Sequence, residues 1–555
     1  MNLPRFALCL IAVLSGSVPA LAGETRGLIG HWPLQGDARD ASGNGRDGTA
    51  HGVDFSAPGP DGKPNGAAKF DGRQAYIKVP AAKAPALGAK EFSLSVHVHT
   101  AATLDDVLGD IVSLYDPTIR RGFNFAVVHN VGATTSPANY RHVQFGIDNE
   151  RRESAWTDHG RLGNAVMIFS LQVHEGRLYA STCESGADEA GRVFVYETGD
   201  RWTDLGAPDK CNAITSLASY NGELYAAASK YGMTGSGLPP AKNLHPGGAI
   251  YRYAGDKQWV SCGQMPDVEC WASMATFRGK LYASSMFYKP ARLFRYEGGS
   301  QWTSIDLLDG RRVDALCVFN GNLFATSYDG GLIYRYDGEN WTFCGALGQS
   351  TQTYGFVVLA GQLYVGTWPG AKVFRYEGDK NWLDVGQLGA EKEVMGAAVY
   401  NGQYYAGTLP PAQVYRYDGP ENWFLTGRLD HTPDVKYRRA WTMAVFQGRL
   451  FCGTLPAGRV LSLEAGKNVT HDRELPHGWQ HLAVVKGRDK LQLYVAGKLA
   501  AASSEFQAAD YDLTVKRPLQ IGFGRHDYFN GSLSDVRLYD RALTAAEVAE
   551  LAGQP

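Results

Sequence analysis

Side chains that could bind a polar ligand stand at fixed distances before a glycine that recurs between residues 156 and 466. When the repeats are aligned on this glycine, the sixth residue before it is always small, whereas the seventh and ninth positions are mixed. In four repeats these two positions supply Arg312, Asp314, Gln352, Tyr354, Glu393, Arg439 and Trp441. Aromatic rings stack on sugar faces, and charged groups hydrogen-bond to hydroxyl or acidic groups. We therefore expect a ligand pocket lined by Arg312, Asp314, Tyr354, Glu393, Arg439 and Trp441. The alternative is a solvated rim with local ion pairs, such as Arg312 with Asp314.

The same residue types allow catalysis as well as binding. Hydrolysis of a glycosidic bond needs two carboxyl groups across a cleft, and Asp314 and Glu393 are the available pair. A lyase acting on uronic acids would need a base such as Tyr354 or His245, with Arg439 neutralising the substrate carboxylate. The sequence leaves these alternatives open.

The repeat also indicates which elements position these residues. The glycine recurs at Gly176, Gly222, Gly279, Gly321, Gly361, Gly402 and Gly448, and a tryptophan follows at Trp202, Trp259, Trp302, Trp341, Trp382 and Trp423. Each unit divides into four short β-rich runs separated by turn dipeptides such as Asn401-Gly402. One small sheet cannot bury both of its faces alone, but a ring of such sheets can. The repeat therefore predicts a β-propeller.

The number of blades follows from the way in which the ring closes. Seven glycines but only six following tryptophans leave the last unit, which begins at Trp441, without a fourth strand. The segment around Trp156 has the pattern of that strand, so we expect it to pair with the last unit and leave no open edge. This predicts seven blades. The repeat resembles kelch-like propellers in its period and its Gly and Trp landmarks, but it lacks their double glycine.

The two regions that flank the repeat have a different pattern. Residues 27–80 hold Trp32 and a glycine-rich stretch at 43–48, and residues 478–543 hold alternating apolar runs such as 491–495. Alternation of this kind is typical of half-buried strands in a sandwich. Together the regions resemble the laminin-G-like, concanavalin A-like jelly-roll domain of many secreted bacterial proteins. The resemblance implies an all-β chain in which one jelly-roll β-sandwich is interrupted by the inserted propeller.

The resemblance also implies a calcium site, because related jelly rolls often bind calcium near their loops. Asp40, Asn44 and Asp535 offer the oxygen ligands that Ca²⁺ takes. Asx residues beside glycine are also ordinary turn formers, so a purely structural role is the alternative. We take Asp40, Asn44 and Asp535 as the candidate metal ligands.

Charge and the N-terminal sequence limit the partners and the compartment. Lys plus Arg number 54 against 56 Asp plus Glu, a net charge of −2, which argues against nucleic acid as a partner. Residues 1–22 carry Arg5, an apolar run too short to span a membrane, and Ala20-Leu21-Ala22, the pattern of a signal peptide. We expect a secreted protein, extracellular or periplasmic, with no membrane span. Its remaining cysteines are odd in number and are expected to be core thiols, with one bridge between Cys262 and Cys270 as the alternative.

These inferences divide the chain into four segments. They are a signal peptide at 1–22, the first half of the sandwich at 23–152, the seven-bladed propeller at 153–466 and the second half of the sandwich at 467–555. The function expected first is that of an exported carbohydrate-binding protein, without catalysis of its own, whose partner is a glycan or polysaccharide. The alternatives are a polysaccharide-degrading enzyme with its active site on the propeller axis, and an extracellular module that binds a cell-surface protein.

Overall fold

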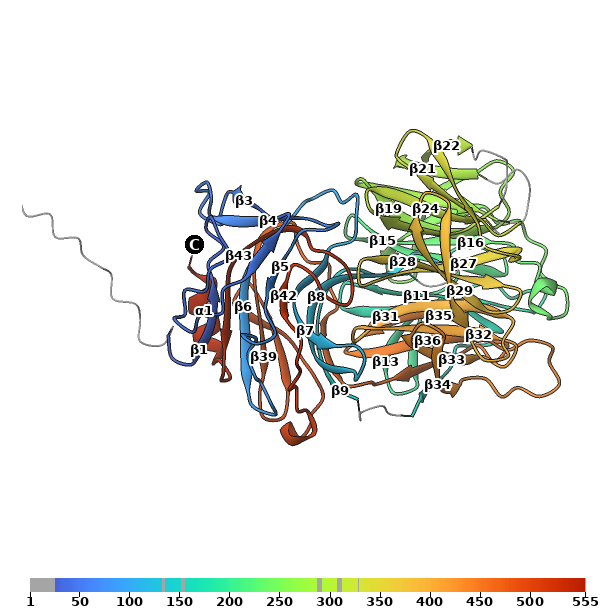
Figure 1. Cartoon of the computed structure of the whole chain (residues 1–555). Helices are drawn as coiled ribbons and strands as arrows, with labels where there is room; N and C mark the ends of the chain where they lie inside the picture. Colours follow the sequence, from blue (N-terminus) through green and yellow to red (C-terminus); the bar gives the residue numbers. More distant parts are fainter. Residues whose placement is uncertain are drawn as a thin grey trace, which may run out of the picture.

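The structure is a computed structural model that describes residues 25–131, 135–150, 155–286, 292–306, 312–327 and 329–554. The expected signal peptide, residues 1–22, lies outside the described residues. Besides the helix α1 (Ala545–Ala552) and the 3-10 turns η1 (Thr234–Ser236) and η2 (Ala508–Asp510), the described elements are β-strands, which confirms an all-β fold. In this described part of the chain, no helix has the length and apolar character needed to cross a membrane. Figure 1 shows a pair of large sheets on the left and a ring of smaller sheets on the right.

Two antiparallel sheets form the body on the left of Figure 1. In the larger sheet β1 (Leu28–Trp32) pairs with β43, and the strand order is β3 (Asp54–Ala57), β4 (Ala67–Asp71), β43 (Asn530–Tyr539), β6 (Phe92–Thr100), β39 (Gly478–Lys486), β40 (Leu491–Val495), β41 (Lys498–Ala502). In the smaller sheet the order is β2 (Thr49–His51), β5 (Tyr76–Val79), β42 (Leu519–Ile521), β7 (Gly109–Asp116), β8 (Arg121–Val131), β9 (Pro137–Asn149), β38 (Lys467–His471). Each sheet contains strands from both ends of the chain, so the two flanking segments build one body.

One apolar core joins the two sheets. Leu94 and Val96 of β6 lie in it, and so do Leu491 and Leu493 of β40. Phe125 of β8 reaches the same core from the other sheet. Every second residue of a strand points to the same face, so the alternating apolar runs bury one face of each sheet.

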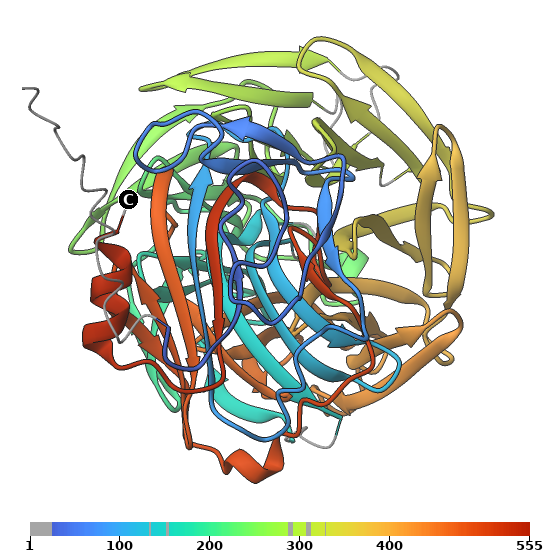
Figure 2. The same ribbon diagram turned by 60° about the vertical axis from the view of Figure 1, so that its left-hand side comes forward.

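Five separate four-stranded sheets form most of the ring, which Figure 2 shows from a second direction. Their first strands contact one another around the axis, and the fourth strands lie outermost. From first to fourth strand, the sheets are β19 (Trp271–Phe277), β20 (Lys280–Ser285), β21 (Arg292–Gly298), β22 (Gln301–Asp306); β23 (Val313–Phe319), β24 (Asn322–Ser327), β25 (Leu332–Tyr336), β26 (Trp341–Ala346); β27 (Gln352–Leu359), β28 (Gln362–Trp368), β29 (Lys372–Gly378), β30 (Asn381–Gln387); β31 (Glu393–Tyr400), β32 (Gln403–Leu409), β33 (Gln413–Gly419), β34 (Asn422–Arg428); and β35 (Arg439–Phe446), β36 (Arg449–Leu455), β37 (Arg459–Leu463), β10 (Thr157–Arg161). This is a β-propeller arrangement.

The remaining two repeats form a single eight-stranded sheet. Its strands are β11 (Met167–His174), β12 (Arg177–Cys183), β13 (Val193–Thr198), β14 (Arg201–Asp204), β15 (Ala213–Tyr220), β16 (Glu223–Ser229), β17 (Ala249–Gly255) and β18 (Gln258–Gln264). The two halves are joined where Cys183 pairs with Ala213. The expectation of seven blades is therefore wrong, since the described part of the ring has five four-stranded blades and one eight-stranded sheet. The backbone pairing of Cys183 with Ala213 joins the sheets of two consecutive repeats, so only the other five repeats form separate four-stranded blades.

The ring is closed by a strand that precedes the first repeat in the sequence. β10 pairs antiparallel with β37, with Thr157 opposite Ser462 and Arg161 opposite Arg459. Trp156, just before β10, packs against the apolar cluster of the last repeats. This pairing confirms that the segment around Trp156 completes the unit that begins at Trp441.

A hairpin of the paired sheets, β8–β9, enters the centre of the ring. The Asn139 amide donates to the Val445 carbonyl oxygen at 2.6 Å, and its oxygen accepts from the Val445 N–H at 2.8 Å. Deeper in the ring, the Thr135 hydroxyl bonds to Ser170, and the Ser273 hydroxyl donates to the Thr135 carbonyl oxygen at 2.6 Å. Ser170 and Ser273 both stand six residues before a repeat glycine. The small side chains at that position thus leave room for the hairpin.

The cysteines of the described residues are all free and buried. Cys262 packs in an apolar cluster between neighbouring sheets, whereas Cys270 belongs to a different cluster at the axis. The alternative of a bridge between Cys262 and Cys270 is therefore wrong.

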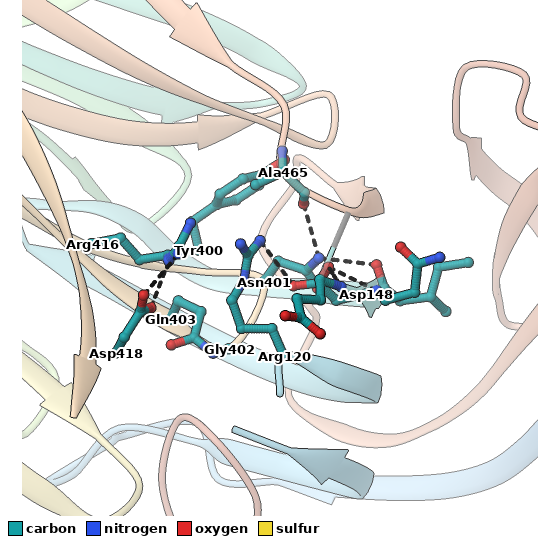
Figure 3. Close-up of polar contacts among 12 residues, drawn as sticks. Arg120, Asp148, Tyr400, Asn401, Gly402, Gln403, Arg416, Asp418 and Ala465 are labelled. Atoms are coloured by element: carbon teal, nitrogen blue, oxygen red, sulfur yellow. Dashed lines mark hydrogen bonds and ion pairs between the residues drawn. The ribbon is translucent and has the colours of Figure 1, made fainter. Parts of the chain in front are cut away.

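The turn between β31 and β32 fastens the ring to the paired sheets (Figure 3). Asn401 and Gly402 have φ angles of 46° and 75°, as expected for a tight Asn-Gly turn. The Asn401 amide donates to the carbonyl oxygens of Ile147 and Ala465, both at 3.0 Å. Ile147 belongs to β9, and Ala465 lies where the chain leaves the ring. One side chain thus joins the two bodies at the point of chain return.

We predict that Asn401→Ala lowers the free energy of unfolding by about 2 kcal/mol more than Asn221→Ala does, because it leaves two buried carbonyl oxygens without a donor. Asn221 is a matched control, since it takes the same turn position in another repeat with φ 50° and is exposed. Both variants put alanine into the left-handed region. Urea denaturation measures the difference, and equal losses would show that the two bonds do not stabilise the junction.

Candidate functional site

The predicted ligand-binding residues lie at the start of the inner strands, at the end of the ring that faces away from the paired sheets. Asp314 lies on β23, Tyr354 on β27, Glu393 on β31, and Arg439 and Trp441 on β35. In each of these strands the pairing register shifts at or just after these residues. A β-bulge of this kind re-aims a side chain. Since the inner strands surround the axis, the residues converge.

Arg439 links several of them. Its Nη2 lies 3.8 Å from Glu393 Oε2, and its guanidinium carbon lies 5.5 Å from the centre of the Trp441 ring. Hydrogen bonding with Tyr354 and the charge of Arg439 both act on Glu393, and the charges of Glu393 and Arg439 act on Asp314. The structure therefore brings these five of the six predicted ligand-binding residues together. We call Asp314, Tyr354, Glu393, Arg439 and Trp441 the axial cluster.

The two carboxyl groups of the axial cluster are buried and largely unpaired. Asp314 is 1% exposed and Glu393 is 2% exposed. Among the described residues, neither oxygen of Asp314 has a hydrogen-bond partner, nor has Oε1 of Glu393. Burial raises the pKa of Asp314 well above its ordinary value, and the neighbouring Glu393 raises it further. Burial also raises the pKa of Glu393, against the opposing effects of Arg439 and Tyr354.

Residues 230–245, which we call the covering loop, close this end of the axis. The loop is the green excursion at the far right of Figure 1. Tyr231 and Met233 pack in the same apolar cluster as Tyr354 and Trp441. Ser236, in η1, accepts a hydrogen bond from Arg439 Nη1 at 2.9 Å. The site is thus a covered cluster, and not the solvated rim that was the alternative to a ligand pocket.

Two other residues considered from the sequence lie outside the axial cluster. Arg312 forms a two-bond ion pair with Asp329, with Nε 2.8 Å from Oδ2, and not the local pair with Asp314. His245 lies at the end of the covering loop, 3.6 Å from Asp209, in a surface cavity of about 870 Å³. The geometry therefore does not place His245 beside Arg439, as the lyase alternative would need.

Two of the three candidate metal ligands, Asp40 and Asp535, already accept hydrogen bonds from nitrogen donors. Asp40 accepts from the backbone N–H of His31 and Ser42 through Oδ1, each at 2.9 Å, and from Arg46 through Oδ2 at 2.9 Å. Asp535 Oδ1 lies 2.7 Å from His31 Nε2 and 2.9 Å from Arg537 Nε. The exposed Asn44 amide donates to Ser42 at 3.0 Å. Within the described ranges, no group of three or more His, Cys, Asp or Glu side chains is arranged to hold a metal. These oxygens do not fit a calcium site, and calcium stays a prediction without structural support.

The residues that sequence reasoning missed come from the covering loop and from one further strand position. Ser236 and Tyr231 follow no repeat position, and only the unusual length of their loop distinguished them. Phe169 on β11 is an axial position by alignment, and its ring meets those of Tyr231 and Trp441 edge to face at 4.8 and 5.6 Å. An apolar residue at a rim position was the signal that this end of the axis is covered.

Comparison with known proteins gives one family match over part of the chain and several distant solved structures. The family profile of the concanavalin A-like lectin/glucanases superfamily matches residues 449–549. No curated protein matches the chain. The similar solved structures include virginiamycin B lyase from Staphylococcus aureus, 10% identical with a TM-score of 0.44, which covers 56% of this chain and 99% of its own. They also include the extracellular domain of BT4673 from B. thetaiotaomicron, 12% identical with a TM-score of 0.42, covering 62% of this chain and 46% of its own. Likeness at this level says nothing about ligand or activity.

We predict that Asp314→Asn stabilises the protein, and increasingly so as the pH rises from about 4, the ordinary pKa of an aspartate, to 7. Below that range the carboxyl is protonated in both the folded and the unfolded protein. As the pH rises, the unfolded chain ionises while the buried group stays protonated, so the wild type loses stability that asparagine keeps. Thermal unfolding at pH 4, 5.5 and 7 measures this. The exposed Asp188→Asn is the control, and a difference between Asp314→Asn and wild type that does not change with pH would contradict the prediction.

Proposed function

We propose that the protein is an exported carbohydrate-binding protein, without catalysis of its own, that holds a sugar at the axial cluster beneath the covering loop. The observation that supports this most directly is the set of buried polar atoms without partners. Asp314 and Glu393 leave carboxyl oxygens unpaired, and Trp441, 3% exposed, leaves its indole N–H unpaired within the described residues. Unpaired buried groups are costly, and binding of a ligand would satisfy those that converge at the axis.

A sugar suits both kinds of unpaired atom. Its hydroxyl groups donate to carboxyl oxygens and accept from an indole N–H. The rings of Trp441, Tyr354 and Phe169 offer apolar faces for the C–H face of a pyranose. The chemistry of the axial cluster therefore matches a polyhydroxylated ligand better than a purely apolar one.

Entry of the ligand requires the covering loop to move. Ser236 and the Gly235 carbonyl oxygen hold it to Arg439 by hydrogen bonds of 2.9 and 3.3 Å. Tyr231 and Met233 add apolar contacts. The two ends of the loop are fixed elsewhere, by hydrogen bonds of Asn212 with Tyr231 and of Asn243 with the Glu189 and Lys210 carbonyl oxygens. The tip at Gly235 and Ser236 is therefore the part that could act as a gate, because hydroxyl groups of a ligand could replace its bonds to Arg439.

The proposal includes a finer description of the chain. We propose a jelly-roll sandwich split into residues 23–152 and 467–555, a kelch-like propeller at 153–466, and export directed by residues 1–22. The superfamily match at 449–549 supports the first part. The proposed partner is a glycan or polysaccharide and the compartment is extracellular or periplasmic.

Glycan-array screening followed by calorimetry tests the proposed function. We expect wild type to bind at least one glycan class and Trp441→Phe to bind it about tenfold more weakly, because phenylalanine keeps the apolar face but lacks the N–H. Tyr253→Phe, an aromatic change on an outer strand, is the matched control. Absence of glycan binding, or equal binding by both variants, would contradict the proposal. Capture that survives glycosidase treatment would favour the protein-interaction alternative.

A second candidate, glycoside hydrolysis, is favoured by the different surroundings of the two carboxyls. Arg439 and Tyr354 favour the ionised form of Glu393, while Glu393 favours the protonated form of Asp314. A pair that differs in this way supplies a general acid, Asp314, and a base or nucleophile, Glu393.

If hydrolysis occurs, we expect Glu393→Gln and Asp314→Asn each to lower kcat by more than about 100-fold, because both carboxyls act in the same step. A reducing-end assay on the polysaccharides bound in the array measures this. Activity that survives Glu393→Gln would exclude this pair as the catalytic residues, and no activity in the wild type would leave binding as the function.

A further inference from the structure

The atoms left unpaired in the axial cluster include more hydrogen-bond acceptors than donors. Three are acceptors, namely both oxygens of Asp314 and Oε1 of Glu393, and two are donors, the Trp441 N–H and the Nε–H of Arg439, whose Nη1 and Nη2 donate to Ser236 and Gly235. Each oxygen can accept more than one hydrogen bond, so acceptor capacity exceeds donor capacity. A neutral sugar hydroxyl brings one donor at a time. A primary ammonium group brings three N–H donors on a single atom. The surplus of acceptors therefore matches a cationic nitrogen more closely than a hydroxyl.

The charges within reach point the same way. Asp314 and Glu393 carry two negative charges when ionised, and Arg439 supplies one positive charge to them. Arg312, whose charge also acts on Asp314, is paired through its Nε and Nη2 with the two carboxylate oxygens of Asp329. With both carboxyls ionised, the cluster is one cation short of neutrality. In the absence of that cation, burial favours protonation of the carboxyls.

The surroundings strengthen this preference. The axial cluster lies among Phe169, Tyr231, Met167, Met233 and Met395, which exclude water. Charge-assisted hydrogen bonds are stronger in such a medium than in water. Aromatic faces within the same shell attract cations as well.

We infer that the ligand of the axial cluster is an amino sugar with a free ammonium group, such as a de-N-acetylated glucosamine unit of a glycan. This inference rests on the proposed carbohydrate binding and specifies its ligand. The ammonium N–H groups donate to Asp314 and Glu393, and a ring or hydroxyl oxygen accepts from Trp441. N-acetylation removes the charge and leaves one N–H, so the acetylated sugar fits poorly. A uronic acid brings no cation to the carboxyls and adds a third acidic group to the cluster.

Calorimetry with two oligosaccharides of equal length, a glucosamine oligomer and its N-acetylated form, tests the inference at pH 6. We expect wild type to bind the free amine at least about tenfold more tightly, as hydrogen bonds between charged partners predict. Asp314→Asn and Glu393→Gln are near-isosteric and should each remove that preference. The exposed Asp188→Asn, on the same face of the ring, should keep it.

Proton release gives an independent readout. If the carboxyls are protonated before binding, the amine must displace protons, so the measured enthalpy should change with the ionisation enthalpy of the buffer. The N-acetylated oligomer should show no such dependence. Melting curves establish that the variants are folded.

The possible failures are distinguishable. Equal or tighter binding of the N-acetylated oligomer, with loss of binding in Trp441→Phe, would overturn the amino-sugar inference and leave carbohydrate binding standing. If Asp314→Asn and Glu393→Gln leave amine binding unchanged, the preference for the amine comes from surface charge, and the inference is overturned. Failure of wild type to bind any glycan would overturn both proposals.

Discussion

The antiparallel pairing of β10 with β37 is the constraint on which the rest of the structure depends. It closes the ring with a strand from its beginning and a strand from its end, so no fourth-strand position is left open in the last unit. It also brings the entry and the exit of the ring together. Only then can β9 and β38 pair, as Ile147 does with Lys467, and build one sheet from two distant segments.

The axial cluster depends on the same closure. Its residues come from four consecutive inner strands, and their convergence requires that these strands surround a common axis. The position six residues before each repeat glycine is small for another reason. Ser170 and Ser273 stand at this position and contact Thr135 of the central hairpin. Two successive positions of the inner strands thus differ in composition for different reasons. The small residues leave room for the central hairpin. The residues of the axial cluster bring together buried polar atoms that have no hydrogen-bond partner among the described residues.

Much of this arrangement was accessible from the sequence. The repeat glycines fixed the inner-strand positions of Asp314, Tyr354, Glu393, Arg439 and Trp441, and the missing tryptophan located the closing strand. The sequence-based predictions were wrong where tertiary contacts outweigh the local sequence pattern. Pairing of Cys183 with Ala213 depends on how two repeats meet, which no feature within either repeat reports. The pairing of Arg312 with Asp329, 17 residues away, and the position of the covering loop depend on the folding of loops outside the repeat.

The central hairpin occupies the axis from the end that faces the paired sheets. β8–β9 fill this end down to Thr135, so the axial cluster can be reached only from the end that the covering loop closes. A glycan bound there, as we propose, could not pass through the ring from one end to the other. It would enter and leave by the same end, so the proposed binding favours a chain terminus or a short branch over the middle of a long polymer.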